Sequence, residues 1–214
     1  MPLAVEMLTV GPVAENCFLL RRQGSDRLLV VDPGEEAERI LAAVEATGAS
    51  VEAILITHCH FDHIGAVAPV AKATGAPVYC PEIEVPILAD IMAFVPWEGF
   101  GPFESYEADE VVRGDETLEL AGLELDVVFT PGHSPGHVTY AIRGEEAIFS
   151  GDVLFQGSVG RVDLPGADGP TLLASIGQLL DRYPDETVVH PGHMGLTTLG
   201  AERATNPFLG SLAR

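Results

Sequence analysis

Short apolar runs alternate with glycine and proline turns along the first part of the chain. These runs are rich in valine, isoleucine and leucine, which is the composition of buried strands. They predict strands over residues 3–10, 16–23, 27–32 and 51–56. Between the last two lies an amphipathic stretch with an acidic first turn, which predicts a helix over 35–47 that ends at Gly48.

The rest of the chain repeats this order of strands followed by helices. Helical periodicity predicts helices over 64–74, 82–92 and 170–182. Residues 93–109 carry proline and glycine without a clean period and predict a loop. Further strands are predicted over 78–80, 117–120, 123–129, 138–142, 146–150 and 186–190. Two sheets packed face to face with helices outside would bury all these strands, so we expect an α+β fold in one domain, residues 1–214.

The composition indicates a globular and strongly acidic protein. Apolar residues make up 47% of the 214 residues, which is enough for a sizeable core. The chain has 11 Lys and Arg against 32 Asp and Glu, and this net charge of -21 disfavours nucleic acid and anionic membranes as partners. No apolar run approaches the roughly 20 residues of a membrane helix, and the N-terminus lacks the basic start of a signal peptide. The three cysteines are not in CxxC spacing, so we expect a cytoplasmic protein in a reducing compartment.

Metal-binding side chains are concentrated directly after the predicted strand 51–56. Residues 58–63 read His-Cys-His-Phe-Asp-His. Because side chains alternate along an extended chain, His58 and His60 should point the same way and Cys59 the opposite way, as a packed thiol. Imidazole and carboxylate together are the ligand set for zinc, iron or manganese. The run therefore predicts a metal site at the end of this strand.

Further metal-binding residues follow strand ends in the second half. Pro-Gly-His occurs at 131–133, 135–137 and 191–193, and Ser-Gly-Asp ends at Asp152. For His137 and His190 we favour a supporting role, hydrogen-bonded to a ligand or to a turn. The remaining donors, with one carboxylate shared, suit two metal ions rather than one. They are His58, His60, Asp62, His63, His133, Asp152 and His193.

In this order of motifs the chain resembles the metallo-β-lactamase superfamily of metallohydrolases. The resemblance rests on the run 58–63, on the turns that end in His133, Asp152 and His193, and on Asp32 in Val-Val-Asp-Pro-Gly. It implies a four-layer αββα sandwich of two mixed β-sheets with the metal centre at one sheet edge. It also implies a first metal held by His58, His60 and His133 and a second held by Asp62, His63 and His193. Asp152 would bridge both metals, and Asp32 would lie near the site without being a ligand.

Within the superfamily the chain is most similar to the glyoxalase II branch, in a short form. Residues 130–137, 150–155 and 160–163 are close to that branch's motifs, and Arg161 is the candidate to bind the glycine carboxylate of glutathione. The alternative for Arg161 is an exposed loop arginine paired with an acid. Residues 206–208, Asn-Pro-Phe, resemble the end of the long enzymes of the branch. The helical segment that normally precedes Asn-Pro-Phe is missing, and Gly210 stands where a basic residue is expected.

The resemblance implies hydrolysis of an S-2-hydroxyacylglutathione such as S-lactoylglutathione to glutathione and a 2-hydroxy acid. The nucleophile would be a hydroxide that bridges two divalent metals, with Asp62 orienting it. Zinc is the first choice of metal, with iron or manganese as alternatives. The partner would be a small-molecule thioester, and the sequence leaves open whether the chain is a monomer or a small homo-oligomer.

Four alternatives remain to be weighed. A persulfide dioxygenase of the same superfamily would use one iron, held by His58, His133 and Asp152. A β-lactamase is disfavoured because Asp152 stands at the bridging position and no export signal is evident. An RNA-processing enzyme is disfavoured by chain length and acidity. A regulatory module without catalysis is disfavoured because every metal-binding residue is intact.

Overall fold

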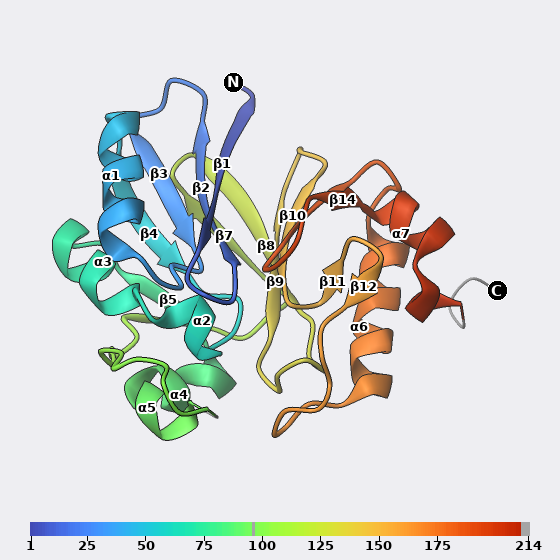
Figure 1. Cartoon of the computed structure of the whole chain (residues 1–214). Coiled ribbons are helices and arrows are strands. Elements are labelled where there is room, and N and C mark those ends of the chain that lie inside the picture. The colour runs from blue at the N-terminus through green and yellow to red at the C-terminus, as the bar shows by residue number, and fades with distance from the viewer. Residues whose placement is uncertain (96, 211–214) are drawn as a thin grey trace.

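Two six-stranded sheets pack face to face in the computed structural model, which describes residues 1–95 and 97–210 (Figure 1). In the first sheet β1 to β3 are antiparallel neighbours, and β3 to β6 run parallel. In chain order and sheet order its strands are β1 (Leu3–Val10), β2 (Glu15–Arg22), β3 (Arg27–Val31), β4 (Ser50–Leu55), β5 (Val78–Pro81) and β6 (Glu110–Val112).

The second sheet is also mixed, because β10 pairs parallel with β13 while all other neighbouring strands of the sheet pair antiparallel. A small separate ribbon is formed by β11 (Leu154–Phe155) and β12 (Ser158–Val159). The order across the second sheet is β14 (Thr197–Thr198), β13 (Val188–Pro191), β10 (Ala147–Gly151), β9 (Val138–Ile142), β8 (Leu123–Phe129) and β7 (Glu116–Leu120).

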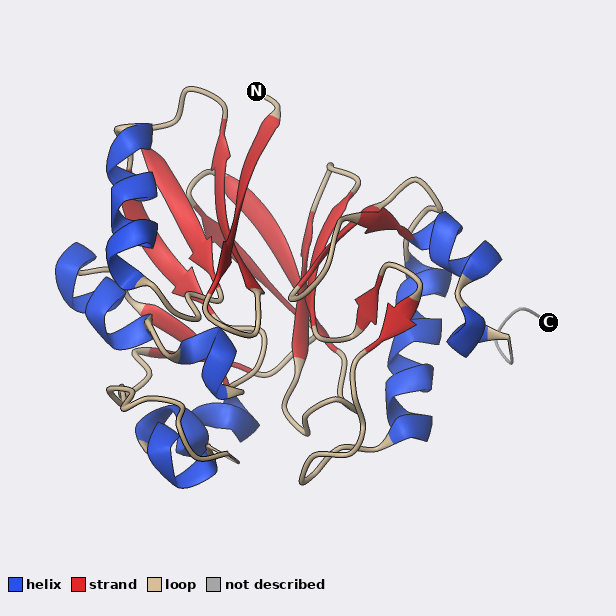
Figure 2. Ribbon diagram, viewed as in Figure 1, coloured by secondary structure: helices blue, strands red, loops and turns tan. Residues whose placement is uncertain are grey.

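Helices cover the outer face of each sheet, so the αββα sandwich predicted from the sequence is confirmed (Figure 2). The first sheet carries α1 (Ala37–Thr47) and α3 (Val67–Thr74), and the second carries α6 (Gly169–Arg182) and α7 (Leu199–Thr205). Shorter helices lie beyond the lower edge of the first sheet in Figure 1. They are α2 (Phe61–Ile64), α4 (Val85–Ala89) and α5 (Ile91–Phe94), with a 3₁₀ turn at Glu82–Glu84 before α4. A second 3₁₀ turn, Pro207–Leu209, follows α7 on the other side of the sandwich. None of the helices among the described residues is long and apolar enough to cross a membrane.

Three apolar cores hold these four layers together. Along β3, Leu28 and Val30 pack toward α1 and α3, whereas Leu29 and Val31 pack toward the second sheet. This strand is therefore buried on both faces, which explains why its sequence is continuously apolar rather than alternating. On the far side, Val128 and Ile148 meet α6 and α7 in the third core.

Several element boundaries differ from the sequence predictions. The helix predicted over 64–74 covers parts of two helices, because α2 ends at Ile64 and α3 begins at Val67. The helix predicted over 82–92 is broken at Asp90, whose φ of -148° is not helical. Five short elements were not predicted from the sequence, namely β6, β11, β12, β14 and α7. Pro96 in the predicted loop and residues 211–214 of the predicted domain lie outside the described residues.

Candidate metal centre

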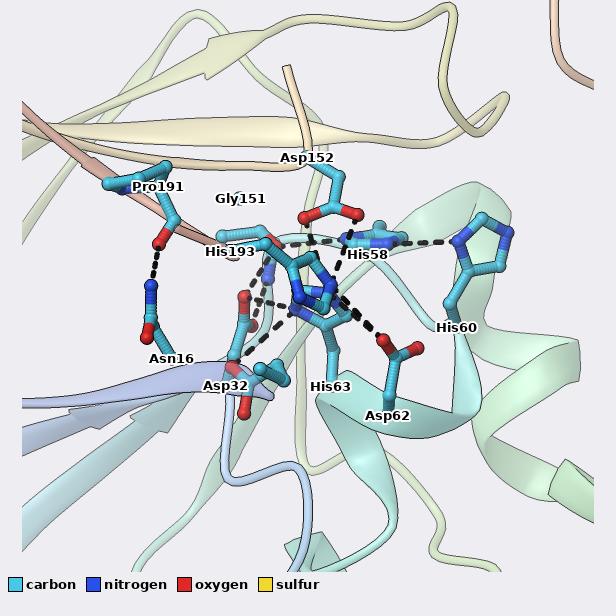
Figure 3. Close-up of polar contacts among 12 residues, drawn as sticks. Asn16, Asp32, His58, His60, Asp62, His63, Gly151, Asp152, Pro191 and His193 are labelled. Atoms are coloured by element: carbon cyan, nitrogen blue, oxygen red, sulfur yellow. Dashed lines mark hydrogen bonds and ion pairs between the residues drawn. The ribbon is translucent and has the colours of Figure 1, made fainter. Parts of the chain in front are cut away.

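All seven predicted metal-binding side chains converge on one edge of the sandwich, where β4, β10 and β13 end. Figure 3 labels these side chains except His133. The chain leaves β4 in an extended form through His60, which has φ -68° and ψ 146° and caps α2. Asp62 and His63 consequently project from the first turn of that helix. The local sequence thus turns four donors toward one small volume.

A first group of donors consists of His58, His60 and His133. The Nε2 atom of His58 lies 3.1 Å from Nδ1 of His60, and the same Nδ1 lies 2.8 Å from Nε2 of His133. All three ligand atoms lie within 4.8 Å of one another. Residues from two distant segments of the chain therefore form a compact set of three nitrogens.

A second group consists of Asp62, His63 and His193. The Oδ2 atom of Asp62 lies 3.2 Å from Nε2 of His193 and 4.0 Å from Nε2 of His63. Asp152 lies between the two groups. Its Oδ1 is 3.4 Å from Nε2 of His63, and its Oδ2 is 3.4 Å from Nε2 of His133.

Outer hydrogen bonds fix which ring nitrogen faces the centre. Nδ1 of His63 lies 3.0 Å from Oδ2 of Asp32, and Nδ1 of His133 lies 2.8 Å from the carbonyl oxygen of Arg161. Nδ1 of His193 lies 3.2 Å from the carbonyl oxygen of Ala14. With these atoms as donors, all three Nε2 atoms remain free toward the centre. Histidines that bind metals are oriented by outer partners of this kind.

The glycines and His137 hold Asp152 in place. The backbone N–H of Asp152 donates to Nε2 of His137 at 3.1 Å, so His137 has the supporting role that we favoured from the sequence. A side chain at Gly192 would lie 2.3 Å from Oδ1 of Asp152, so only glycine allows this close approach. His190 lies away from the donors, stacked on Phe149 with ring centroids 4.5 Å apart.

The field of the site favours a cation. Burial lowers the pKa of His58 well below its usual value and lowers that of His60 to about 3, which keeps both rings neutral. Burial acts the same way on His63, but the carboxylates of Asp152 and Asp62 outweigh it and raise the pKa of His63 well above its ordinary value. The same negative charges that stabilise a proton on His63 would stabilise a metal ion.

Among the seven donor side chains, two buried atoms lack a hydrogen-bond partner among the described residues, namely Nε2 of His63 and Oδ1 of Asp152. Buried polar atoms rarely remain unpaired, because each one loses its hydration without compensation. The two atoms lie 3.4 Å from each other, on the side of the centre where Asp62 also lies. Neutral imidazole nitrogens and ionised carboxylates together are the ligand set of divalent metals, so the residues present suit such ions.

Three residues that support the centre were not predicted from the sequence. Thr57 donates its N–H at 2.7 Å and its hydroxyl at 2.6 Å to Asp32. Glu84 is fully buried and accepts from Cys59 N, Ser134 Oγ and Gly136 N, so it ties the turns before His60 and His137 together. Glu15 is fully buried beside His63. Their only sequence signal is a polar residue in or beside an apolar run.

A cavity of about 640 Å³ opens over these donors. Cys59 lies at its base with 1% exposure, and its Sγ lies 3.6 Å from Sγ of Cys80, so it is the packed thiol predicted from the sequence. Arg161 lines the rim and makes two bonds to Asp163, at 2.7 and 2.8 Å. The alternative of a loop arginine paired with an acid is therefore realised, while a bond from Arg161 to substrate stays a prediction.

Sequence comparisons identify relatives over nearly the whole chain. A family model for the metallo-beta-lactamase superfamily matches residues 10–193. The probable metallo-hydrolase YqgX of Bacillus subtilis is 40% identical over 207 residues, which cover 94% of this chain and 95% of that protein. The hydroxyacylglutathione hydrolase GloC of Haemophilus influenzae is 31% identical over 209 residues, which cover 97% of this chain and 98% of that protein.

Solved structures agree with these matches. The crystal structure of BLEG-1 B3 metallo-beta-lactamase has a TM-score of 0.91 and 38% identity, and the match covers 97% of this chain and all (100%) of that one. The structure of TTHA1623 in a di-iron-bound form has a TM-score of 0.74 and 42% identity, with 95% of this chain and 100% of that one covered.

Proposed function

Because the chain belongs to the metallo-beta-lactamase superfamily, we propose that it is a binuclear metallohydrolase that cleaves a thioester. The first substrate to consider is an S-2-hydroxyacylglutathione such as S-lactoylglutathione, in keeping with the 31% identity to GloC over almost the full length. The observation that carries the proposal is the position of Asp152. It lies 3.4 Å from a donor of each group, so the same carboxylate could serve metals held by both groups.

Different residues of the chain would bind the metals, orient the attacking water and fix a metal-binding ring. The two groups of donors would hold divalent metals, whose chemistry would be to lower the pKa of a bound water from about 15.7 to about 7 and to polarise a substrate carbonyl. Asp62 stays ionised, because His63 and His193 outweigh its burial and lower its pKa, so it accepts a hydrogen bond from the attacking water and orients it. Asp32 fixes the ring of His63. A thiol has a pKa of about 8.5 and leaves as the thiolate, so the site needs no strong proton donor.

The donor set does not discriminate between zinc, iron and manganese. We propose zinc as the first metal, with iron or manganese as alternatives. TTHA1623, a protein 42% identical to this chain, has a di-iron-bound form, so elemental analysis of this chain should measure iron as well as zinc. We also propose that the protein acts in the cytoplasm, in keeping with three buried and unpaired cysteines.

A second candidate is hydrolysis of a β-lactam at the same centre. One observation favours it, the TM-score of 0.91 with a B3 metallo-beta-lactamase. We place it second because a β-lactam amine leaves less readily than a thiolate and Asp152 lies where a bridging carboxylate would stand. A persulfide dioxygenase would use only His58, His133 and Asp152, which leaves Asp62, His63 and His193 without a role, so we rank it below both.

Elemental analysis together with a substrate panel tests the proposal. We expect about two metals per chain and hydrolysis of S-lactoylglutathione, with little turnover of a penicillin and no oxygen uptake with glutathione persulfide. His60→Ala and Asp62→Ala should each lose metal and most thioesterase activity. The control Glu107→Ala changes an exposed residue of the loop before β6 and should retain both metal and activity. Unchanged turnover in both site variants would refute the assignment of this centre.

A further inference from the structure

The cavity over the metal centre has a polar floor and apolar walls. The floor contains the donors His60, Asp62, His133, Asp152 and His193. One wall is formed by Ile87 of α4, Ile91 and Phe94 of α5, and Trp97. Phe155 and Leu164 contribute to the opposite wall. A volume of about 640 Å³ with this lining is typical of a site for a sizeable organic ligand rather than for a small polar one.

Positive charge is scarce around this cavity. Arg161 is the only lysine or arginine among the described residues that line it. Its guanidinium is already bound by both oxygens of Asp163 and lies 5.5 Å from the ring centroid of Trp97. Two other cations lie elsewhere and are paired, Lys72 with Glu104 and Arg143 with Asp126. Glutathione has two carboxylates and an ammonium group, and the apolar walls offer none of them a partner.

We propose that the substrate of this chain is a thioester with a bulky, apolar acyl group that fills this cavity. The inference rests on the proposed thioester hydrolysis and specifies its substrate class. The scissile carbonyl must lie over the polar floor, so the groups on either side of it occupy the cavity and its rim. Biological thiol carriers are polar and charged, whereas the acyl group is the part of a thioester that varies in apolar size. The acyl group therefore packs against Ile91 and Phe94, and the carrier extends past the rim at Arg161.

A series of S-acylglutathiones tests this assignment with the zinc-loaded protein. The acetyl, butyryl and hexanoyl thioesters share one carrier and differ only in apolar length, and S-lactoylglutathione supplies the short polar comparison. Burial of each methylene should raise kcat/KM roughly fourfold until the cavity is filled. A flat or falling series with rapid hydrolysis of S-lactoylglutathione would overturn the acyl assignment and leave thioester hydrolysis standing. Hydrolysis of no member would overturn both.

Binding without turnover provides a second measurement. Trp97 is the only tryptophan of the chain and lines the cavity, so its fluorescence reports occupancy. The thioether S-hexylglutathione, which cannot be hydrolysed, should change this fluorescence at a concentration at least about tenfold lower than S-methylglutathione. Equal affinities of the two thioethers would contradict the proposal whatever the hydrolytic activity.

A pair of phenylalanine variants tests whether the cavity wall formed by α4 and α5 causes the dependence of kcat/KM on acyl length. Phe94 lines the cavity and is 52% exposed, whereas Phe208 is 53% exposed and lies outside it. Phe94→Ala should flatten the acyl-length series, with a loss of about fivefold to tenfold for hexanoyl and little change for acetyl. Phe208→Ala should reproduce the wild-type series. The same slope in Phe94→Ala as in wild type would exclude this wall as the acyl site.

Discussion

The two halves of the molecule supply the metal centre in different ways. The first half provides His58, His60, Asp62 and His63 from one exit of β4 into α2. The second half provides His133, Asp152 and His193 from three turns, each at the end of a different strand or loop. The first set is local, because its relative geometry depends on a few backbone angles. The second set is close together only because the second sheet forms.

The outer partners repeat this contrast. The carboxylate of Asp32 accepts three hydrogen bonds from residues of the first half. The donors are Thr57 N, Thr57 Oγ1 and His63 Nδ1. Asp152 depends on a single backbone bond to His137 and on the parallel pairing of β10 with β13, which shifts register next to it. We therefore expect the first half to hold its donors more firmly than the second.

The largest expected effect comes from removing the link between the halves. Asp152→Asn keeps the shape of the side chain but removes the charge that faces both groups, so kcat/KM should fall by more than about 100-fold, beyond the range for outer partners. Metal content per chain should fall as well, measured by elemental analysis. Asp185→Asn, at an exposed surface pair with Arg203, is the control and should match wild type. Full activity in Asp152→Asn would mean that the two groups act independently.

Changing one outer partner in each half compares their support directly. Asp32→Asn and His137→Gln should each weaken metal binding, within the roughly 10- to 100-fold range measured for such partners. The loss should be greater for Asp32→Asn, because three contacts depend on its charge, whereas His137 reaches the centre only through the backbone N–H of Asp152 and uses its other nitrogen for Thr130 Oγ1. Competition with a chelator measures both affinities. A greater loss in His137→Gln would reverse the proposed difference between the halves.

Glu84 joins the two halves without touching the donors. Glu84→Gln would place an amide N–H₂ against groups that donate to it, Cys59 N or Ser134 Oγ and Gly136 N. Such a mismatch in a buried site should reduce the free energy of unfolding by about 1–3 kcal/mol. Urea unfolding measures this, with Glu82→Gln as the control, since Glu82 pairs with Arg113 on the surface and should change stability by less than about 1 kcal/mol. Equal stability of both variants would show that Glu84 does not couple the halves.

The smallest effect at neutral pH concerns His190 in the second half. Burial lowers its pKa to about 4, whereas an unfolded histidine titrates near about 6.5. Between these values the unfolded chain binds a proton that the folded chain does not, so stability falls as the pH is lowered from about 6.5 to about 4. For the metal-free protein this contribution should reach roughly 3 kcal/mol at pH values below about 4 and be absent in His190→Gln. Thermal unfolding of both forms across this pH range measures it, and parallel curves would contradict the burial of His190 as its cause.

Prediction from the sequence succeeded where a residue's environment is set by its neighbours in the chain. The continuously apolar run from Leu28 to Val31 indicated a buried strand, and the structure places its successive residues in two different cores. Prediction failed for β6 and β14, which are three and two residues long and have no internal period. It also failed for Glu84, because a glutamate between the apolar residues Ile83 and Val85 resembles the polar face of a surface helix until the fold buries it.

By itself the sequence determined the layered α+β fold and the local turn that presents His58, His60, Asp62 and His63, since both depend on short-range periodicity and backbone preference. It also named His133, Asp152 and His193, but only by resemblance and by the turns that precede them. Tertiary structure alone decided that Asp152 stands 3.4 Å from a donor of each group. It also enclosed the donors beneath apolar walls, because side chains far apart in sequence meet there only after the two sheets have packed and excluded water.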